Sequence, residues 1–488
     1  MYSSRTSLAP TYGHIINGQE TFSEKTTSVF NPATGLRLAD VPVLSSSQLD
    51  EAVDAAERAF PMWASKTYEQ RGSVLLEMAI IIESRVNQYK ELLTSEQGKP
   101  HREALSEIMG AVHWFREAAC LRLPEIIHED SPRRKVITHH VPLGVTAAII
   151  PWNYPILLAV WKIAPALLAG NTILVKPSPW TPLTTLSIIA DLQRALPPGV
   201  LSGINGDEEL GPLITAHPRI KKIAFTGSIQ TGKLIMHSTS HDLKRITLEL
   251  GKMFLRKIFT EVDEELLYKT GAYFGELSLT TANFALLRIY IHNSIYEFVR
   301  DALVAYARAV VVGDGAQEST QIGPVQNYEL FKKLRDIFED TKARKCKFAL
   351  GGEFPTATSD RTCGLFVPIT IVDNPPEDSR VVQDEQFGPI VPLLRWEDEA
   401  DVVRRANATH YGLGASVWGN DLVQATRIAS QIESGNVWVN EIHKFGPTIP
   451  GGGHKQSGIG VENGIAGLKE WTNYQTISIN RVEVAAIE

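Results

Sequence analysis

Two glycines and a serine stand where a predicted strand passes into a predicted helix. Gly227 and Ser228 follow the apolar run 222–225, and Gly232 comes a few residues later. At such a junction the backbone N–H groups of the loop and the N-terminus of the helix can face a pyrophosphate. The spacing therefore predicts a phosphate-binding loop.

The segments around this loop alternate between strand and helix signals. Short apolar runs at 145–150, 172–175, 222–225 and 245–248 predict buried strands, and each ends in a loop that contains Pro, Gly or Ser. This pattern predicts an α/β fold with a largely parallel sheet, in which ligands bind at the carboxyl ends of the strands. A second α/β stretch is predicted from about residue 261 to about residue 446.

Local patterns predict a helix start and a pair of exposed strands. Ser47, with Asp50 three residues later, is expected to cap a helix whose apolar residues recur at helical spacing. Residues 132–140 and 470–482 alternate in polarity, which predicts strands that pair with each other or with a second subunit.

Composition excludes several classes of protein. The 488 residues contain 48 Lys and Arg against 55 Asp and Glu, so the chain lacks the basic excess that binding to a nucleic acid backbone requires. The apolar stretch 145–169 is interrupted by prolines and by Lys162, and residues 1–20 do not resemble a secretory signal, so neither a membrane span nor export is expected. Cys120, Cys346 and Cys363 form no C-x-x-C pair, which argues against a disulfide framework and a bound metal and favours the cytoplasm.

Seven short motifs follow one another along the chain. They are P-W-N-Y-P at 151–155, K-P-S at 176–178, F-T-G-S-x-x-x-G at 225–232, L-E-L-G at 248–251, E-Q-F-G-P at 385–389, N-V-W-V-N at 436–440 and K-Q-S-G-I-G at 455–460. In this order they resemble the aldehyde dehydrogenase superfamily. The resemblance implies a Rossmann-like NAD(P)-binding domain (1–120 and 143–250), an α/β catalytic domain (251–450) and small oligomerisation strands (121–142 and 465–488). It also implies a homodimer or homotetramer that acts on a small-molecule substrate.

The same resemblance assigns residues to the cofactor. Gly227 and Ser228 correspond to the cofactor phosphate loop, Lys176 to the residue that holds the adenosine ribose, and Glu385 to the residue that holds the nicotinamide ribose. The remaining expected contacts are Trp152, Ser178, Pro179, Leu250 and Phe387. Many NAD-preferring members carry, at the place of Pro179, a Glu that repels a 2′-phosphate, so both NAD and NADP are expected to be acceptable.

Two residues match the catalytic positions of the family. Asn153 corresponds to the residue whose amide donates a hydrogen bond to the developing oxyanion, and Glu249 to the general base. Each has a plainer interpretation, with Asn153 capping the turn between Pro151 and Pro155 and Glu249 acting only as a surface carboxylate.

The nucleophile loop departs from the family pattern. Counting back five residues from Arg288 places Asn283 at the position of the catalytic cysteine and Thr281 at that of a glutamine, and no cysteine lies between Cys120 and Cys346. Because covalent aldehyde oxidation needs a thiolate, conventional activity is expected to be absent or very weak. Gly451 takes the place of an aromatic residue that walls the substrate tunnel, which predicts a wider pocket mouth.

Three hypotheses account for a retained cofactor site without a thiol. The favoured one is NAD(P)-dependent, non-covalent hydride transfer that reduces an imine or a carbonyl, with Asn153 and Asn283 holding the heteroatom and Glu249, Thr280 or Thr281 relaying the proton. The second is a catalytically silent scaffold that still binds nucleotide. The third is a non-redox acid/base catalyst that uses Glu249.

Overall fold

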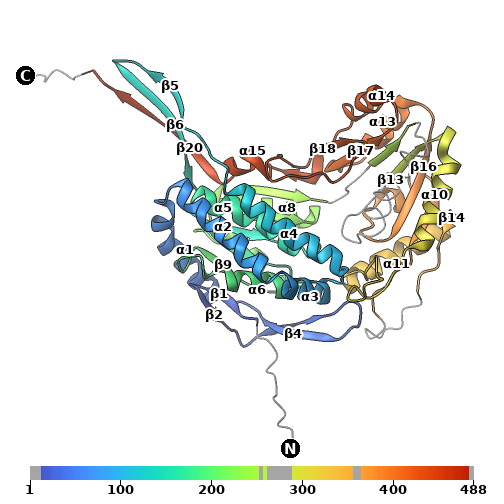
Figure 1. Cartoon of the computed structure of the whole chain (residues 1–488), viewed down its shortest axis with the longest axis horizontal. Coiled ribbons are helices and arrows are strands. Elements are labelled where there is room, and N and C mark those ends of the chain that lie inside the picture. The colour runs from blue at the N-terminus through green and yellow to red at the C-terminus, as the bar shows by residue number, and fades with distance from the viewer. Residues whose placement is uncertain (1–11, 252–255, 261–287, 356–363, 483–488) are drawn as a thin grey trace, which may run out of the picture.

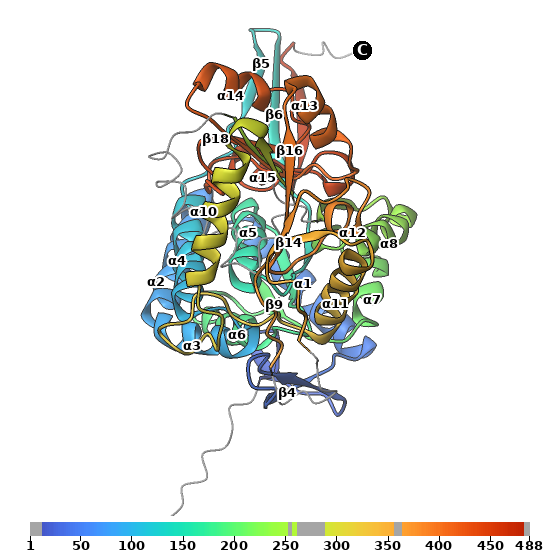
Figure 2. The same cartoon turned by 90° about the vertical axis from the view of Figure 1, so that its right-hand side faces the viewer.

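The computed structural model describes residues 12–251, 256–260, 288–355 and 364–482. Two large sheets covered by helices form the body, and a narrow three-stranded sheet projects from it (Figure 1). A two-stranded hairpin of β3 (Thr26–Phe30) and β4 (Arg37–Pro42) lies at the opposite end from this projection (Figure 2).

The first sheet contains the predicted apolar strands. Its order is β19-β11-β10-β7-β8-β9-β1-β2. The bounds are β1 (His14–Ile16), β2 (Gln19–Thr21), β7 (Val145–Ile149), β8 (Thr172–Lys176), β9 (Leu201–Gly203), β10 (Lys222–Gly227), β11 (Arg245–Leu250) and β19 (Gly458–Ile459). The central strands from β11 to β9 are parallel and consist largely of buried residues, as expected for a sheet covered on both faces.

The path of the chain through this sheet creates a topological switch point. From β7 the chain moves outward to β8 and β9, and it then returns to the other side of β7 to form β10 and β11. In open α/β sheets the crevice at the carboxyl ends of the two diverging strands is the usual ligand site. The loops after β7 and β10 are therefore the places where a ligand is expected.

Helices cover both faces of this sheet (Figure 1). They are α1 (Ser46–Ala64), α2 (Tyr68–Ser84), α3 (Val86–Gln97), α4 (His101–Ala118), α5 (Pro155–Ala169), α6 (Leu183–Leu192), α7 (Leu210–Ala216) and α8 (Ile229–Thr239), with the short turn η1 (Ser240–Asp242). α5 follows β7 directly and accounts for most of the apolar stretch 145–169. No helix in the described part of the chain is long and apolar enough to cross a membrane.

The start of α1 differs from the predicted one. The cap is Ser45, whose Oγ accepts a hydrogen bond from the backbone N–H of Gln48, and Gln48 Oε1 accepts one from the N–H of Ser45 in return. The prediction of Ser47 as the cap is wrong by two residues. Residues 45–47 are all serine, so residue type alone does not decide which of them caps the helix. The reciprocal hydrogen bonds with Gln48 favour Ser45, and the pair of Ser47 and Asp50 cannot match them.

The second sheet has the order β14-β15-β16-β13-β12-β17-β18. Its strands are β12 (Arg256–Phe259), β13 (Arg288–His292), β14 (Lys347–Leu350), β15 (Thr370–Asp373), β16 (Ile390–Trp396), β17 (Gly414–Trp418) and β18 (Asn436–Val439). Its helices are α10 (Tyr296–Ala309), α11 (Tyr328–Ala343), α12 (Arg380–Gln383), α13 (Glu399–Asn407), α14 (Leu422–Ala429) and α15 (Gly464–Lys469), with η2 (Asn293–Ile295) and η4 (Lys455–Ser457). All its strand pairs are parallel except β14 with β15, and apolar clusters fill both faces. α15 packs against α5 and η4 packs against β11, so both contact the layer of the first sheet.

The projecting sheet has the order β20-β6-β5 and joins distant parts of the chain. β6 (Arg134–Pro142) pairs antiparallel with β20 (Thr472–Asn480) along nine consecutive residues, and β5 (Ile126–Asp130) pairs on its other side. The predicted pairing of the two alternating segments with each other is confirmed. We call β5, β6 and β20 the arm.

Candidate active site

The carboxyl ends of four adjacent strands meet at the switch point. Ile149, the last residue of β7, pairs with Phe225 of β10 on one side and with Lys176 of β8 on the other. Thr226 pairs with Glu249 of β11. The strand ends that carry Lys176, Gly227 and Glu249 are therefore neighbours, and the loop with Asn153 leaves the sheet between them.

The predicted phosphate loop connects β10 to α8. Ser228 is the N-cap of α8, and its Oγ accepts a 3.1 Å hydrogen bond from the backbone N–H of Thr231. A Cβ on Gly232 would lie 2.4 Å from the side chain of Leu250, so only glycine lets α8 approach β11 this closely. A Cβ on Gly227 would similarly lie 2.3 Å from the Phe225 ring. The N-terminus of α8 follows directly on the end of β10, and the first N–H groups of a helix can stabilise an anion.

Lys176 ends β8 with its ammonium group buried. Burial lowers the pKa of Lys176 from 10.5 to about 8, and the charge of Asp207 opposes this only in part. Among the described residues its Nζ has one hydrogen-bond acceptor, the main-chain oxygen of Pro177 at 3.5 Å. Ser178 follows, buried, with its Oγ accepting from the N–H of Trp180 at 3.3 Å, and Pro179 lies half-buried between them. The Lys176 ammonium group can therefore donate a further hydrogen bond to a ligand hydroxyl.

A loop of the second sheet meets the loop after β7. The rings of Trp152 and Phe387 lie 5.1 Å apart between centroids, and Phe387 has a left-handed backbone with φ of 56°. Glu385 lies two residues before, and its charge adds to burial in raising the pKa of Tyr411 to about 12. Residues 385–387 of the catalytic half thus contact the same region as the strand ends of the first sheet.

A cavity of about 560 Å³ lies between α4 and α5, and Thr226 and Glu249 are among the residues that line it. One face of α4 and one face of α5 line it at helical spacing, and loops of the second half close it. Its lining comprises Arg102, Glu103, Ser106, Glu107, Gly110, Trp114, Tyr154, Leu157, Leu158, Trp161, Thr226, Glu249, Leu413, Asn436, His443, Phe445, Gly451, Gly452 and Glu462. The cavity brings Glu249 and Gly451 together, as the resemblance requires.

Asn153 lies buried just before Tyr154 and is not among the residues that line the cavity. The alternative in which Asn153 caps the turn between Pro151 and Pro155 stays a prediction. The N-cap of α5 is Tyr154, and the N–H groups of Ile156 and Leu157 donate to Glu107 Oε1 at 2.8 and 3.2 Å. The carboxylate of another helix, and not the Asn153 amide, satisfies this helix end.

Glu462 was not identified from the sequence, and it is one of four carboxylates that line the cavity, with Glu103, Glu107 and Glu249. Glu462 lines it, and Glu462 Oε1 accepts a 2.6 Å hydrogen bond from Lys162 Nζ, with both side chains buried. The other oxygen, Oε2, has no partner among the described residues. The one available signal was Lys162 itself, because a lone charge in an apolar stretch must find a buried counter-charge.

Tyr154 adds a hydroxyl to the same lining. Burial raises the pKa of Tyr154 well above its ordinary value, and the nearby charges of Glu103 and Glu107 raise it further. The phenol therefore stays protonated near neutral pH.

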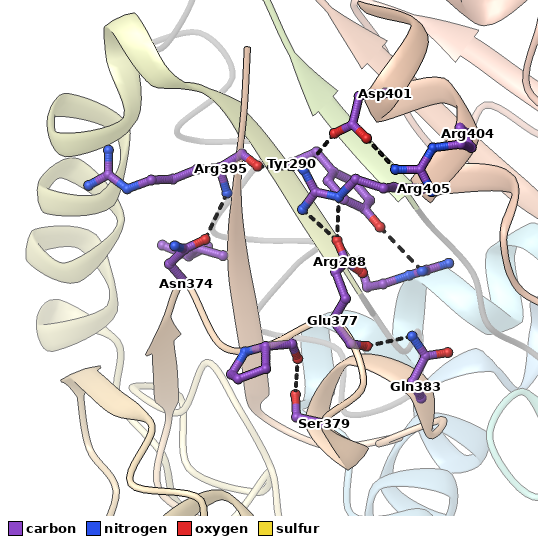
Figure 3. A network of polar contacts seen from close by, with 12 residues as sticks. Arg288, Tyr290, Asn374, Glu377, Ser379, Gln383, Arg395, Asp401, Arg404 and Arg405 are labelled. Carbon is purple, nitrogen blue, oxygen red and sulfur yellow. Dashed lines mark hydrogen bonds and ion pairs between the residues drawn. The ribbon is translucent and has the colours of Figure 1, made fainter. Parts of the chain in front are cut away.

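The predicted positions Thr280, Thr281 and Asn283 lie outside the described residues, and so does Cys363. The structure does describe Arg288, the residue from which those positions were counted. Arg288 begins β13, is buried, and donates to Tyr290 Oη and Thr409 Oγ1 at 3.2 Å each. Arg405 lies over the other side of the Tyr290 ring and pairs with Glu377 and Asp401 (Figure 3). The strand that receives the predicted nucleophile loop is thus held by a polar network.

We find no candidate metal-binding cluster in the described part of the chain. It contains no cluster of three or more His, Cys, Asp or Glu side chains that could hold a metal ion. Cys120 is exposed on the surface and Cys346 is partly buried, where burial raises the pKa of its thiol.

Comparison with known proteins agrees with this architecture. Residues 19–477 match the model of the aldehyde dehydrogenase family. Aldehyde dehydrogenase LUC3 from a Fusarium species is 38% identical over 461 residues, which cover 94% of this chain and 96% of that protein.

Two solved structures illustrate the similarity of fold. A betaine aldehyde dehydrogenase from Staphylococcus aureus, solved as a point mutant with NAD⁺, superposes with a TM-score of 0.91 at 31% identity and covers 98% of this chain and 99% of its own. An NADP-dependent enzyme from E. coli reaches a TM-score of 0.91 at 29% identity, with 96% of this chain and 98% of its own covered. The chain belongs to the aldehyde dehydrogenase family.

Proposed function

We propose that this protein binds NAD or NADP at the switch point and uses it to reduce the carbonyl or imine group of a small molecule, without a covalent enzyme intermediate. The observation that carries the proposal is the cavity that Thr226 and Glu249 line together. Thr226 immediately precedes the phosphate loop at Gly227, so a substrate in the cavity would reach the dinucleotide side of the sheet.

The residues present fit such a cofactor. Gly227 and Gly232 let the loop and α8 pack closely on Phe225 and Leu250, and the N-terminus of α8 suits a pyrophosphate. The buried ammonium group of Lys176 is placed to donate to a ribose hydroxyl, and we assign Glu385 to the second ribose. Further contacts are assigned to Trp152, Ser178, Pro179, Ser228, Leu250 and Phe387. When bound, the nicotinamide supplies or accepts a hydride.

The chain's own residues would then orient and polarise the acceptor. We assign the Asn153 amide to donate to the substrate heteroatom as charge develops on it, and Asn283 to the same task from the nucleophile loop. Glu249 would hold or deliver the accompanying proton, with Thr280 or Thr281 as a relay. A covalent route would need a nucleophilic thiol in this loop, and no cysteine lies between Cys120 and Cys346.

Turnover of nicotinamide tests the proposal. Purified protein is incubated with NADH or NADPH and a panel of imines, iminium ions and aldehydes, and loss of the reduced nicotinamide absorbance is followed. We expect turnover that Glu249→Gln lowers by about 10²–10⁴-fold and Asn153→Ala by about 10²–10³-fold. If the protein binds dinucleotide but oxidises none of it with any substrate, the scaffold hypothesis replaces this one. Product formed without nicotinamide would instead favour the non-redox hypothesis.

A restored thiol tests the position of Asn283. In a background that carries Cys120→Ser, the variant Asn283→Cys is treated with iodoacetamide, and the labelled peptides are identified by mass spectrometry. We expect labelling at position 283, and we expect its extent to change when the nicotinamide cofactor is added, because that loop would face the cofactor. If the thiol at position 283 stays unlabelled, or if the cofactor does not change its labelling, Asn283 does not belong to the site.

A further inference from the structure

An aromatic surface runs along one side of the cavity. The indole rings of Trp114 on α4 and Trp161 on α5 lie 5.3 Å apart between centroids and are within 22° of parallel. Phe445 contacts the edge of Trp161 at 6.0 Å, and His443 stacks on Phe445 at 15°. All four line the cavity, and we call them the aromatic wall.

A hydrogen bond and a ring contact hold the aromatic wall in place. Trp114 Nε1 donates a 2.9 Å hydrogen bond to the side-chain oxygen of Asn463. The buried ring of Trp438 packs edge-on against Phe445 at 5.2 Å and 85°. Because these contacts use no atom of a ligand, the wall exists before a substrate binds, which lowers the entropic cost of binding a rigid flat group.

The charges along the cavity cancel in pairs. Three carboxylates on the lining each face a cation, in the pairs Glu107 with Lys99, Glu462 with Lys162, and Glu103 with Arg102 at 3.7 Å. Glu249 is the remaining lining carboxylate, and the proposed function places the reacting group beside it. A charged substrate body would be desolvated beside pairs that are already neutral, so the cavity favours a neutral one.

The ring faces are also largely taken. Lys99 Nζ lies 4.0 Å from the centroid of the Tyr154 ring, and Trp114 and Trp161 each direct one face at the other. The Tyr154 ring therefore already makes a cation–π contact with a residue of the protein. A flat apolar group needs only the exposed side of one ring, on which it can stack with an offset.

We infer that the substrate is a neutral carbonyl compound, or the derived imine, whose body is planar and apolar, such as an aryl or conjugated chain stacked on the aromatic wall. This inference rests on the proposed function only in taking the cavity as the substrate's path. A cavity of about 560 Å³ suits a ligand of this kind.

Gly110 provides a matched pair of variants. It lines the cavity opposite Leu157, and a Cβ at position 110 would meet the nearest atom, Leu157 Cδ1, at 3.5 Å, an ordinary contact. Gly110→Ala should therefore fold and leave the cavity open. Gly110→Leu places a branched side chain in the same opening and should close it.

Isothermal titration without nicotinamide tests the inference, because binding then needs no turnover. The probes are benzaldehyde and trans-cinnamaldehyde as planar neutral aldehydes, cyclohexanecarboxaldehyde as a puckered ring of equal size, betaine aldehyde as a cation and succinic semialdehyde as an anion. We expect the planar aldehydes to bind about threefold to tenfold more tightly than the puckered one, and the charged ones more weakly still. Trp161→Leu should reduce the planar preference to below about twofold. Gly110→Leu should abolish binding that Gly110→Ala retains.

Three results would overturn the inference: charged probes that bind as tightly as benzaldehyde, a planar preference that survives in Trp161→Leu, or binding unaffected in Gly110→Leu. Should Trp161→Leu fail to fold, judged by circular dichroism, the wild-type probe series and the Gly110 pair still decide. Nicotinamide oxidation measured on the same samples separates the two proposals. Selective binding without turnover refutes the proposed function alone, whereas turnover with no preference among the probes refutes this inference alone.

Discussion

Lys99 Nζ donates a 2.9 Å hydrogen bond to the main-chain oxygen of Asn153, and the same ammonium group pairs with Glu107. Both charged side chains are at most 1% exposed. Glu107 in turn accepts from the first N–H groups of α5, so one buried ion pair positions both the Asn153 turn and the helix that lines the cavity.

Breaking this pair should destabilise the protein strongly. Lys99→Met leaves the Glu107 carboxylate buried without its counter-charge, and we expect the free energy of unfolding to fall by about 3–5 kcal/mol. Urea denaturation measures it. The double variant Lys99→Met/Glu107→Gln removes both charges and keeps an acceptor oxygen for α5, so its loss should be smaller than the sum of the two single losses. An additive double variant would show that the pair is not coupled.

Stability should rise with pH between about 8 and 10.5 because of Lys176. In the unfolded chain this lysine takes up its proton near its ordinary pKa of 10.5, whereas burial lowers the folded pKa to about 8. Between these values the unfolded state binds more protons, so falling pH costs about 1.4 kcal/mol per pH unit, about 3 kcal/mol in all, and the cost is constant below pH 8.

The buried Lys222, whose pKa is also lowered to about 8, contributes a slope of the same sign. Lys176→Met should therefore remove about half of the pH dependence measured by chemical denaturation across this interval. An unchanged slope in that variant would mean that Lys176 is not desolvated in solution.

Cofactor preference should respond to a single charge at position 179. Pro179 directly follows the Lys176-Pro177-Ser178 segment, and Pro179→Glu would place a carboxylate near the proposed ribose site. We expect this variant to bind NADP at least about tenfold more weakly and NAD with little change, since like charges close together are costly. Pro179→Gln, similar in shape and neutral, is the control, and fluorescence titration with NADH and NADPH gives the affinities. Equal losses in both variants would point to lost packing instead of charge.

The arm should mediate self-association. Ile127, Ile477 and Ile479 are each more than 40% exposed on it, and β20 lies at the edge of its sheet with one side open to pairing among the described strands. We expect a dimer or tetramer by size-exclusion chromatography with light scattering. Ile477→Lys/Ile479→Lys should yield a folded monomer, while Leu422→Lys, which replaces an exposed apolar residue on α14, should not. If the wild-type protein is a monomer, the arm does not mediate self-association.

Arg288 should stabilise the second sheet. It is 1% exposed, and its guanidinium donates to the hydroxyl groups of Tyr290 (Figure 3) and Thr409. Hydrogen bonds to a charged group contribute about 1.5–3 kcal/mol, so Arg288→Met should lower the free energy of unfolding by at least that much. Arg288→Lys keeps the charge without the planar donor geometry and should recover part of the loss. Equal stability of Arg288→Met and wild type, measured by urea denaturation, would contradict the role.

Local rules explain what could be predicted from the residues in order. The apolar runs that became β7, β8, β10 and β11 are each continuous and bounded by breakers, so their strands follow from neighbours in the chain. The loop at Gly227 and Ser228 was predictable for the same reason, since a strand, a glycine and an N-cap serine lie within a few residues of one another.

Contacts between distant segments explain what could not be predicted. Glu462 and Lys162 are 300 residues apart, and Trp114 and Asn463 are 349 apart, so no spacing rule connects them. The sequence by itself determined the α/β class, the buried strands of the first sheet, the two alternating segments of the arm and the absence of a cysteine between 120 and 346. Only the tertiary structure decided that α4, α5 and the loop at 443–462 enclose one cavity with paired charges and a flat aromatic side. The reason is physical: buried charges and rings are positioned by the packing of whole helices, which local periodicity does not encode.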